Sequence, residues 1–317
     1  METRQLGGSG LTVSIVGLGC NNLGGMKQSL DTAGATAVVH AALDAGITLF
    51  DTADSYGTAG GSEILLGKAL GPRRRDIVLA TKFASPMNRE VSTRFNGGRR
   101  YIFQAVEDSL RRLNTDHIDL YQYHFPDPLT PIEETLGALD DLVRSGKVRH
   151  IACSNLPGWQ LVDAAWTARH HGYERFLSTQ AEYSLLARSA ERELFPALRA
   201  CDMTLLPYFP LASGLLTGKY RKGGDIPADG RMAIGRFAQQ MTDARMARVE
   251  ALIAFAEARG RSILELAMSW LARQPIVSSI IAGATRPEQV RANVAATGWT
   301  LSADDLAELD RLTLDGG

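Results

Sequence analysis

The sequence predicts an α/β fold: a (β/α)8 TIM barrel with an N-terminal β-hairpin plug and an extra C-terminal helix. Short apolar or β-branched runs recur eight times along the 317 residues, and helical segments separate them. Parallel strands need crossover connections, so this alternation indicates a parallel sheet. Eight such units in a chain of this length favour a closed barrel over an open doubly wound sheet. The expected strands are residues 14–18, 47–51, 77–82, 118–124, 148–153, 177–182, 203–208 and 278–282.

The other expected elements follow in chain order. Residues 4–13 indicate a small hairpin with a glycine-rich turn, placed to plug the N-terminal mouth of the barrel. Ser62 is predicted to cap a helix that ends at Gly71. A last helix is predicted to begin at Ser302 as an appendage to the barrel. Two further amphipathic helices are predicted at residues 102–113 and 132–143.

One connection is longer than the others. About seventy residues separate the seventh and eighth predicted strands, including a basic, glycine-containing stretch at residues 218–236. Most βα loops are short, so a long one on a compact domain indicates a functional loop.

Composition limits the classes of function. Apolar residues make up 45% of the chain and no linker interrupts it, so residues 1–317 are expected to form one domain. A formal net charge of -1 gives no basic footprint for nucleic acid, and no apolar run approaches the roughly 20 residues that span a bilayer. Three cysteines without metal spacing and an N-terminus without a secretory h-region predict a cytoplasmic protein. The sequence gives no indication of the oligomeric state.

Four residues with complementary chemistry stand at the ends of adjacent predicted strands. Asp51 and Tyr56 follow the second strand, Lys82 ends the third and His124 ends the fourth. In a βα barrel these strand ends converge on the face where sites are built. A Lys82 ammonium held by Asp51 would make Tyr56 a better proton donor, and His124 can orient a carbonyl oxygen. Each residue singly has a plain structural explanation, but together they predict carbonyl reduction beside a hydride source.

Longer segments resemble the aldo-keto reductase family. They occur in family order, and with shorter matches they span residues 4 to about 296. The resemblance implies a barrel that binds NADP(H), in preference to NAD(H), in extended form across its C-terminal face. It also implies that the barrel reduces a small-molecule aldehyde or ketone, or oxidises the alcohol, with Tyr56 as general acid–base. The main segments are residues 50–57, 80–83, 121–128, 180–186, 208–220 and 283–290.

The resemblance also implies which residues hold the cofactor. The implied nicotinamide contacts are Ser154, Asn155, Gln180 and Tyr208, the implied pyrophosphate loop contains Leu211, Gly214, Leu216 and Lys219, and the implied adenine and 2′-phosphate segment contains Gly283, Arg286, Gln289 and Asn293. The residues support the last group independently, because Arg286 precedes a helix whose free amides would add to an anion site. A solvent-facing Arg286 and a core-packing Tyr208 are the plainer alternatives.

The chain departs from the family pattern at several positions. Phe209 stands where a serine is commoner, and Cys20 and Asn21 stand where Thr or Met is usual. We expect Cys20 and Asn21 to shape the substrate mouth together with Tyr56 and His124. The remaining pocket walls are expected from residues 20–26, 86–99 and 221–236, where Arg94, Arg99 and Arg100 either receive an anionic substrate or form a solvated basic loop.

The sequence has three alternative interpretations. Gly17-x-Gly19 resembles the start of a dinucleotide fingerprint, but Asn22 replaces its last glycine and no acidic residue follows at the ribose position, so we reject a Rossmann fold. A metal-dependent barrel lyase would need clustered ligands, yet among the histidines only His124 ends a strand, and we expect no metal site. The stronger alternative is a cofactor-sensing regulatory subunit with little turnover, similar to the barrel subunits that accompany potassium channels.

Overall fold

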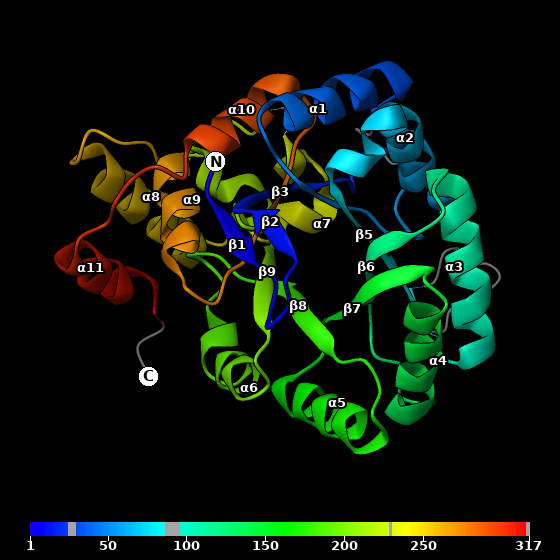
Figure 1. The fold of residues 1–317 in the computed structure, drawn as a ribbon. Helices are drawn as coiled ribbons and strands as arrows, with labels where there is room; N and C mark the ends of the chain where they lie inside the picture. Colours follow the sequence, from blue (N-terminus) through cyan, green and yellow to red (C-terminus); the bar gives the residue numbers. More distant parts are fainter. Residues whose placement is uncertain (25–29, 86–95, 228–229, 315–317) are drawn as a thin grey trace.

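The structure, a computed structural model, describes residues 1–24, 30–85, 96–227 and 230–314. Its centre is an eight-stranded parallel sheet in the order β10-β3-β4-β5-β6-β7-β8-β9, so strands adjacent in sequence lie side by side (Figure 1). The strands are β3 (Val16–Gly19), β4 (Leu49–Asp51), β5 (Val78–Phe83), β6 (Ile118–Tyr123), β7 (Val148–Ser154), β8 (Phe176–Glu182), β9 (Thr204–Tyr208) and β10 (Ile280–Gly283).

The sheet curls into a nearly closed barrel. Its first and last strands along the chain, β3 and β10, pair in parallel. At the remaining seam, the Leu205 N–H donates to the Ile276 carbonyl (2.7 Å), and the Leu205 carbonyl accepts from the Ser278 N–H (3.1 Å). These bonds join β9 to the residues just before β10. The (β/α)8 barrel predicted from the sequence is therefore confirmed.

Helices cover the outside of the barrel (Figure 1). The crossover helices up to β9 are α1 (Thr32–Asp44), α2 (Gly61–Leu70), α3 (Arg99–Leu113), α4 (Ile132–Arg144), α5 (Gly158–His171) and α6 (Leu194–Ala200), and α10 (Pro287–Ala295) follows β10. The apolar stripe predicted for α3 is buried, including Ile102, Val106 and Leu113. Helical periodicity therefore identified the face that packs against the strands.

The segment between β9 and β10 is more structured than the expected loop. It contains η4 (Ala212–Thr217), η5 (Arg231–Ala233), α7 (Gly235–Ala238), α8 (Asp243–Glu257) and the crossover helix α9 (Ile263–Arg273). Irregular backbone is found at residues 218–227, where the basic, glycine-containing composition predicted it. The buried face of α8, which includes Val249 and Leu252, packs into the core.

The appended helix α11 (Ala303–Thr313) packs against α8, beside it in Figure 1. Ser302 caps it and forms a reciprocal capping box with Asp305, as the sequence predicted. The same Asp305 accepts a hydrogen bond from Arg259 (2.7 Å), which follows α8. The C-terminal helix is also bonded to the loop after β8, because Arg188 donates to Asp310 (2.7 Å) and to the Thr313 hydroxyl (2.8 Å).

Ser62 does not cap α2, which corrects a prediction. The helix begins at Gly61, and its N-cap is Gly60, two residues before Ser62, in a left-handed conformation (φ 75°). The Ser62 side chain is buried, and its hydroxyl donates to the Cys20 carbonyl (2.7 Å) and bonds to the Thr52 hydroxyl (2.8 Å). Ser62 therefore ties the loop after β3 to the loop after β4.

The N-terminal hairpin closes one end of the barrel, seen at the front of Figure 1. Its strands, β1 (Thr3–Gln5) and β2 (Thr12–Ser14), pair antiparallel, so Ser14 ends β2 rather than starting the first barrel strand as expected. Leu6 and Val13 are fully buried among the inward-facing residues of the barrel strands. These residues are Leu49, Val78, Ala80, Leu120, Ala152, Leu177, Leu206 and Ile281.

We expect Leu6→Ala to destabilise the protein by about 2–5 kcal/mol, the usual loss for a large-to-small change at a fully buried site. Leu11→Ala is the matched control, because Leu11 packs against the same cluster but is only partly buried. Urea unfolding measures both free energies. Equal losses for the two variants would show that the hairpin does not plug the barrel.

Candidate active site

The Lys82 ammonium is the centre of the candidate site. Lys82 lies on β5 with its side chain fully buried, and its three N–H groups each meet an oxygen. These oxygens are the Asp51 carboxylate (2.6 Å), the Thr52 carbonyl (2.9 Å) and the Tyr56 hydroxyl (3.1 Å). The structure thus brings together three of the four residues expected from the strand ends.

The loop that carries Tyr56 continues the β4–β5 pairing beyond the strand. The Thr52 N–H donates to the Ala80 carbonyl (2.9 Å), and the Asp54 N–H donates to the Lys82 carbonyl (3.1 Å). The Tyr56 N–H then closes a turn onto the Ala53 carbonyl (3.2 Å). This path explains the Asp-x-x-x-x-Tyr spacing, because the turn returns the phenol to the lysine beside the last strand residue.

Two glutamines satisfy the other oxygen of Asp51. Its Oδ1 accepts from Gln122 Nε2 (2.8 Å) and from Gln180 Nε2 (2.9 Å), and both amides are buried. Sequence analysis missed Gln122, because its position beside Lys82 depends on the register of β5 and β6, which the structure gives. Gln180 was expected at a nicotinamide carboxamide, and in this structure its amide nitrogen instead holds the carboxylate.

His124 follows β6 and stands beside the phenol. Its ring meets the Tyr56 ring edge-on, with centroids 5.8 Å apart. Burial, and secondly the charge of Lys82, holds the pKa of His124 well below its usual value. The ring is therefore neutral at neutral pH. Its Nδ1 is buried without a hydrogen-bond partner among the described residues.

The protonation states differ in part from the expectation. Burial raises the pKa of Tyr56 above its usual value, and the Lys82 charge lowers it without outweighing burial. For Lys82, burial acts to lower the pKa, but Asp51 and Tyr56 prevail and the pKa is raised. At neutral pH the pair is therefore a neutral phenol beside an ammonium. Lys82 favours loss of the phenol proton, as expected, while burial keeps that proton on Tyr56.

Four of the implied nicotinamide residues form one hydrogen-bonded group next to His124. Asn155 adopts a left-handed conformation (φ 61°) and donates to the His124 carbonyl (3.0 Å) and to the Ser154 hydroxyl (3.0 Å). The Tyr208 hydroxyl donates to the Asn155 side chain (2.9 Å), and the Ser154 hydroxyl to the Gln180 carbonyl (2.9 Å). Tyr208 is therefore half-buried and hydrogen-bonded through its hydroxyl, unlike a tyrosine that only packs in the core.

The turn after β9 has an unusual backbone. Phe209, Ala212 and Ser213 all have positive φ (50°, 46° and 59°), and Gly214 follows at 105°. Such non-glycine conformations gather at ligand clamps, and turns of this kind can direct successive amides at an anion. Within the turn the Ala212 N–H donates to the Phe209 carbonyl (2.8 Å) and the Gly214 N–H to the Leu211 carbonyl (2.8 Å), so these two amides are already bonded.

The side chains of the same loop differ in what they can reach. Leu216 is fully buried and Leu211 is partly buried against the core, and the Leu216 N–H already donates to the Leu211 carbonyl (3.2 Å). Lys219 is exposed, and its ammonium lies over the Tyr220 ring (5.1 Å to the centroid).

The residues expected around an adenine and 2′-phosphate divide into two groups. Gly283 and Arg286 are exposed at the end of β10 and the N-cap of α10. Gln289 turns back instead, because its side-chain carbonyl accepts from the Thr285 N–H (2.7 Å) and hydroxyl (3.1 Å). Asn293 is buried in α10. Among these four residues, Arg286 carries the positive charge, and its side chain is exposed.

The expected substrate mouth is only partly described. Cys20 is buried, so its thiol does not line a mouth, whereas Asn21 is half-buried. Asn22, which sequence analysis treated only as a mismatch to a glycine, accepts from Arg231 of η5 (3.1 Å). Residues 25–26, 86–95 (with Arg94) and 228–229 of the expected walls lie outside the described residues.

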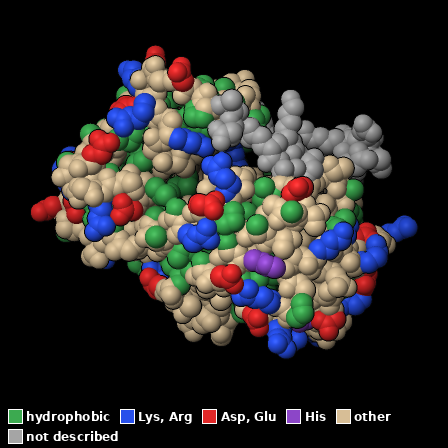
Figure 2. Space-filling model, turned by 90° about the horizontal axis from the view of Figure 1, so that it is seen from above, with side chains coloured by type: hydrophobic (Ala, Val, Ile, Leu, Met, Phe, Trp, Pro, Cys, Tyr) green, Lys and Arg blue, Asp and Glu red, His purple; other side chains and the backbone are tan. Residues whose placement is uncertain are grey.

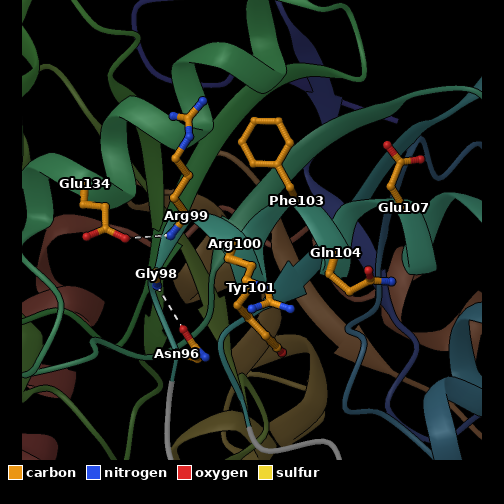
Figure 3. A pocket seen from close by; sticks show the side chains of 9 residues that line it. All are labelled: Asn96, Gly98, Arg99, Arg100, Tyr101, Phe103, Gln104, Glu107 and Glu134. Atoms are coloured by element: carbon orange, nitrogen blue, oxygen red, sulfur yellow. Dashed lines mark hydrogen bonds between the residues drawn. The ribbon is translucent and has the colours of Figure 1, made fainter.

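A surface pocket of about 670 Å³ lies elsewhere, on the first turns of α3 (Figure 3). Arg99 of this pocket is already bonded: its backbone N–H donates to Glu134 (2.9 Å), and its guanidinium pairs with Asp141. Arg99 also lies over the Phe103 ring, so it does not extend toward Lys82. Arg100 lines the pocket as well. The pocket contains none of the four strand-end residues.

Other kinds of site find little support in the described part of the chain. It contains no group of three His, Cys, Asp or Glu side chains that could hold a metal ion. None of its helices combines the length and the apolar character needed to cross a membrane. On the face shown in Figure 2, Lys and Arg side chains are interspersed with Asp and Glu, in keeping with the net charge of -1.

Comparison with known proteins identifies similar chains. The profile of the aldo/keto reductase family matches residues 15–313. The chain is 36% identical over 317 aligned residues to aldo-keto reductase YhdN of Bacillus subtilis (strain 168), covering 98% of this chain and 93% of that protein. It is 32% identical over 329 residues to L-glyceraldehyde 3-phosphate reductase of Escherichia coli O157:H7, covering 100% and 93%. It is also 34% identical over 308 residues to a probable voltage-gated potassium channel subunit beta of Oryza sativa subsp. japonica, covering 93% and 91%.

Proposed function

The chain belongs to the aldo/keto reductase family, and from this premise we propose that it is an NADPH-dependent enzyme that reduces an aldehyde or ketone to the alcohol, reversibly. The observation that supports this most is the buried Lys82 ammonium, bonded at once to Asp51 and to the Tyr56 hydroxyl. The test is to add a reactive aldehyde to protein and NADPH, whereupon the nicotinamide absorbance is expected to fall.

In this proposal Tyr56 moves the proton. The neutral His124 donates a hydrogen bond to the carbonyl oxygen of the substrate and orients it. Tyr56 then transfers its proton to that oxygen as negative charge develops there. The Lys82 ammonium stabilises the tyrosinate that remains, and Asp51 keeps the ammonium in place. In the oxidation direction the tyrosinate accepts the proton from the alcohol.

The hydride would come from a bound nicotinamide cofactor, NADP(H) in preference to NAD(H). We propose that Ser154, Asn155 and Gln180 bind the carboxamide and that the Tyr208 ring stacks on the nicotinamide. The two amides now bond to neighbouring protein groups, so they would have to exchange those bonds for the ligand. We assign the pyrophosphate to the positive-φ turn, with Leu211, Gly214, Leu216 and Lys219, and the adenine and 2′-phosphate to the segment containing Gly283, Arg286, Gln289 and Asn293.

Arg286→Ala tests the proposed cofactor preference. We expect its Kd for NADPH to rise about ten- to hundredfold, because a charge-assisted phosphate contact is lost, while its Kd for NADH stays the same. Arg291→Ala is the matched control, because Arg291 is another exposed arginine of α10, paired with Glu288 (3.2 Å). Fluorescence titration gives both constants. An equal change with NADPH and NADH would contradict phosphate recognition by Arg286.

The second candidate function is a cofactor-sensing regulatory subunit with little turnover. The similarity to the potassium channel subunit beta over 93% of this chain favours it. The four strand-end residues do not separate the two functions, since a sensor can keep them. Steady-state turnover with a panel of aldehydes separates them, because a sensor would bind NADPH and leave it almost unoxidised.

A further inference from the structure

A second polar cluster lies directly behind the loop that carries Tyr56. It consists of Asp54 from that loop, Glu63 of α2, Tyr101 and Arg112 of α3, and Tyr121 of β6. Asp54 and Glu63 have no exposed surface. Two buried carboxyl groups therefore lie in a cluster that contains one guanidinium, and the reaction proposed above uses none of these residues.

Glu63 forms an ion pair with Arg112, the cation of this cluster. Its carboxylate accepts from Arg112 Nε (2.6 Å) and from the Thr81 hydroxyl (2.6 Å), so both of its oxygens are bonded. Arg112 gains room for this from Gly60, because a Cβ at Gly60 would lie 2.5 Å from Arg112 Nε. The arrangement makes Glu63 the partner of Arg112 in this cluster.

Asp54 is left with weaker partners. One oxygen accepts a long hydrogen bond from the Tyr101 hydroxyl (3.3 Å), and the other is buried with no hydrogen-bond partner among the described residues. The Tyr121 hydroxyl nearby is also buried and unpartnered there, so it does not compensate. A buried carboxylate with so little compensation is unfavourable, whereas a neutral carboxylic acid avoids the burial of charge.

We propose that Asp54 is a positioning residue for Tyr56, held as a neutral acid that ties the loop, through Tyr101, to the first turn of α3. The tie acts two residues before Tyr56, on the backbone that returns the phenol to Lys82. Figure 3 shows Tyr101 leaving α3 in a direction away from Phe103 and Arg99. The inference rests on the proposed function for its catalytic consequence, but not for the state of Asp54.

The surroundings of Asp54 predict how pH acts on it. Burial, and secondly the charge of Glu63, raises the pKa of Asp54 to about 8, while Arg112 and Tyr101 act in the opposite direction. Above that pH the carboxylate forms. Its bond from Tyr101 then becomes stronger, but a buried charge with so few donors is expected to draw in water and displace the loop that carries Tyr56. The pKa values of Tyr56 and Lys82 are raised above their usual alkaline values and that of His124 is lowered well below its usual value, so none of these three should titrate near pH 8.

Activity measurements test the positioning role. We expect wild-type kcat to fall above about pH 8, and Asp54→Asn, which cannot ionise, to keep near-normal kcat without this alkaline limb. Asp54→Ala should lower kcat by about tenfold with an unchanged KM for NADPH, since small misplacements of reacting groups cause losses of this order. Unchanged kcat in Asp54→Ala, or a wild-type limb in Asp54→Asn, would overturn the proposal.

Tyr101→Phe provides a second test of the positioning role of Asp54 if Asp54→Ala does not fold. Without the Tyr101 hydroxyl the Asp54 carboxylate loses a donor, so the alkaline limb should move to higher pH. Tyr173→Phe is the control, because it removes the hydroxyl of another half-buried tyrosine, between α5 and β8. Identical pH profiles for Tyr101→Phe and Tyr173→Phe would contradict the tie.

Melting temperatures test the neutral acid without reference to catalysis. Between about pH 4 and pH 8 the folded protein keeps the Asp54 proton, whereas the unfolded chain releases it. Wild-type stability should therefore fall relative to Asp54→Asn as pH rises across that range. A constant difference in Tm would overturn the neutral state. If the wild type reduces no carbonyl, the proposed function fails, and this comparison still decides the state of Asp54.

Discussion

Tyr56→Phe is expected to lower kcat for carbonyl reduction by about 10²–10⁴-fold, the range attributed to a positioned general acid. The substitution removes only the hydroxyl that bonds to Lys82, and the ring can keep its edge-on contact with His124. The Lys82–Asp51 pair does not depend on that hydroxyl. We therefore expect the fold and the Kd for NADPH to stay near wild-type values while turnover is lost.

Steady-state kinetics and fluorescence titration of NADPH give the two quantities for this variant. Tyr173→Phe is again the control and should leave both unchanged. If Tyr56→Phe turns over at the wild-type rate, another group supplies the proton. If it binds NADPH far more weakly, Tyr56 has a binding role and the loss of turnover does not report on proton transfer.

Lys82→Met is expected to have the second large effect, on stability as well as on turnover. It removes the cation from a fully buried ion pair and leaves the Asp51 carboxylate with only its glutamine donors. Breaking one partner of such a pair typically destabilises a protein by about 3–5 kcal/mol. Urea unfolding measures the change, and kcat should fall with it because the tyrosinate loses its counter-charge.

A double variant distinguishes loss of the pair from loss of packing. In Asp51→Asn/Lys82→Met the buried carboxylate is absent, so part of the lost stability should return while turnover stays low. Asp51→Asn alone provides the remaining corner of the cycle. If the two single losses simply add in the double variant, the Lys82–Asp51 pair is not energetically coupled and the account of the site is wrong.

The strand ends were predictable because short, simple signals determine them. Apolar runs of strand length separated by amphipathic helices predicted all eight barrel strands, and the barrel geometry then placed Asp51, Lys82 and His124 on one face. Tyr56 was placed with them only by its spacing from Asp51. The hairpin plug and the capped C-terminal helix were also predictable from local sequence, because turn and capping residues indicate them.

What escaped prediction depends on contacts between distant segments. Ser62 has the right residue type for a cap, but its hydroxyl bonds to Cys20 and Thr52 across two loops. Gln122 became visible only when the register of β5 and β6 was known. The pKa of Tyr56 likewise depends on how far burial outweighs Lys82, and residue identity cannot supply that balance.

Asp54 shows the same limit most clearly. Its position in the tyrosine loop was evident from the sequence, yet its state depends on Glu63 having taken Arg112 from a different helix. A sequence pattern names the charged residues, but it does not show which of them are paired.

Transfer of deuterium from NADPH labelled at both C4 positions tests the central claim most directly. The purified protein would be mixed with this cofactor and an unlabelled aldehyde, and the alcohol analysed by mass spectrometry. The proposed function predicts one deuterium on the alcohol carbon of the wild-type product and almost none in the same time with Tyr56→Phe. Protein that binds the cofactor yet forms no labelled alcohol would contradict the reductase and favour the regulatory subunit.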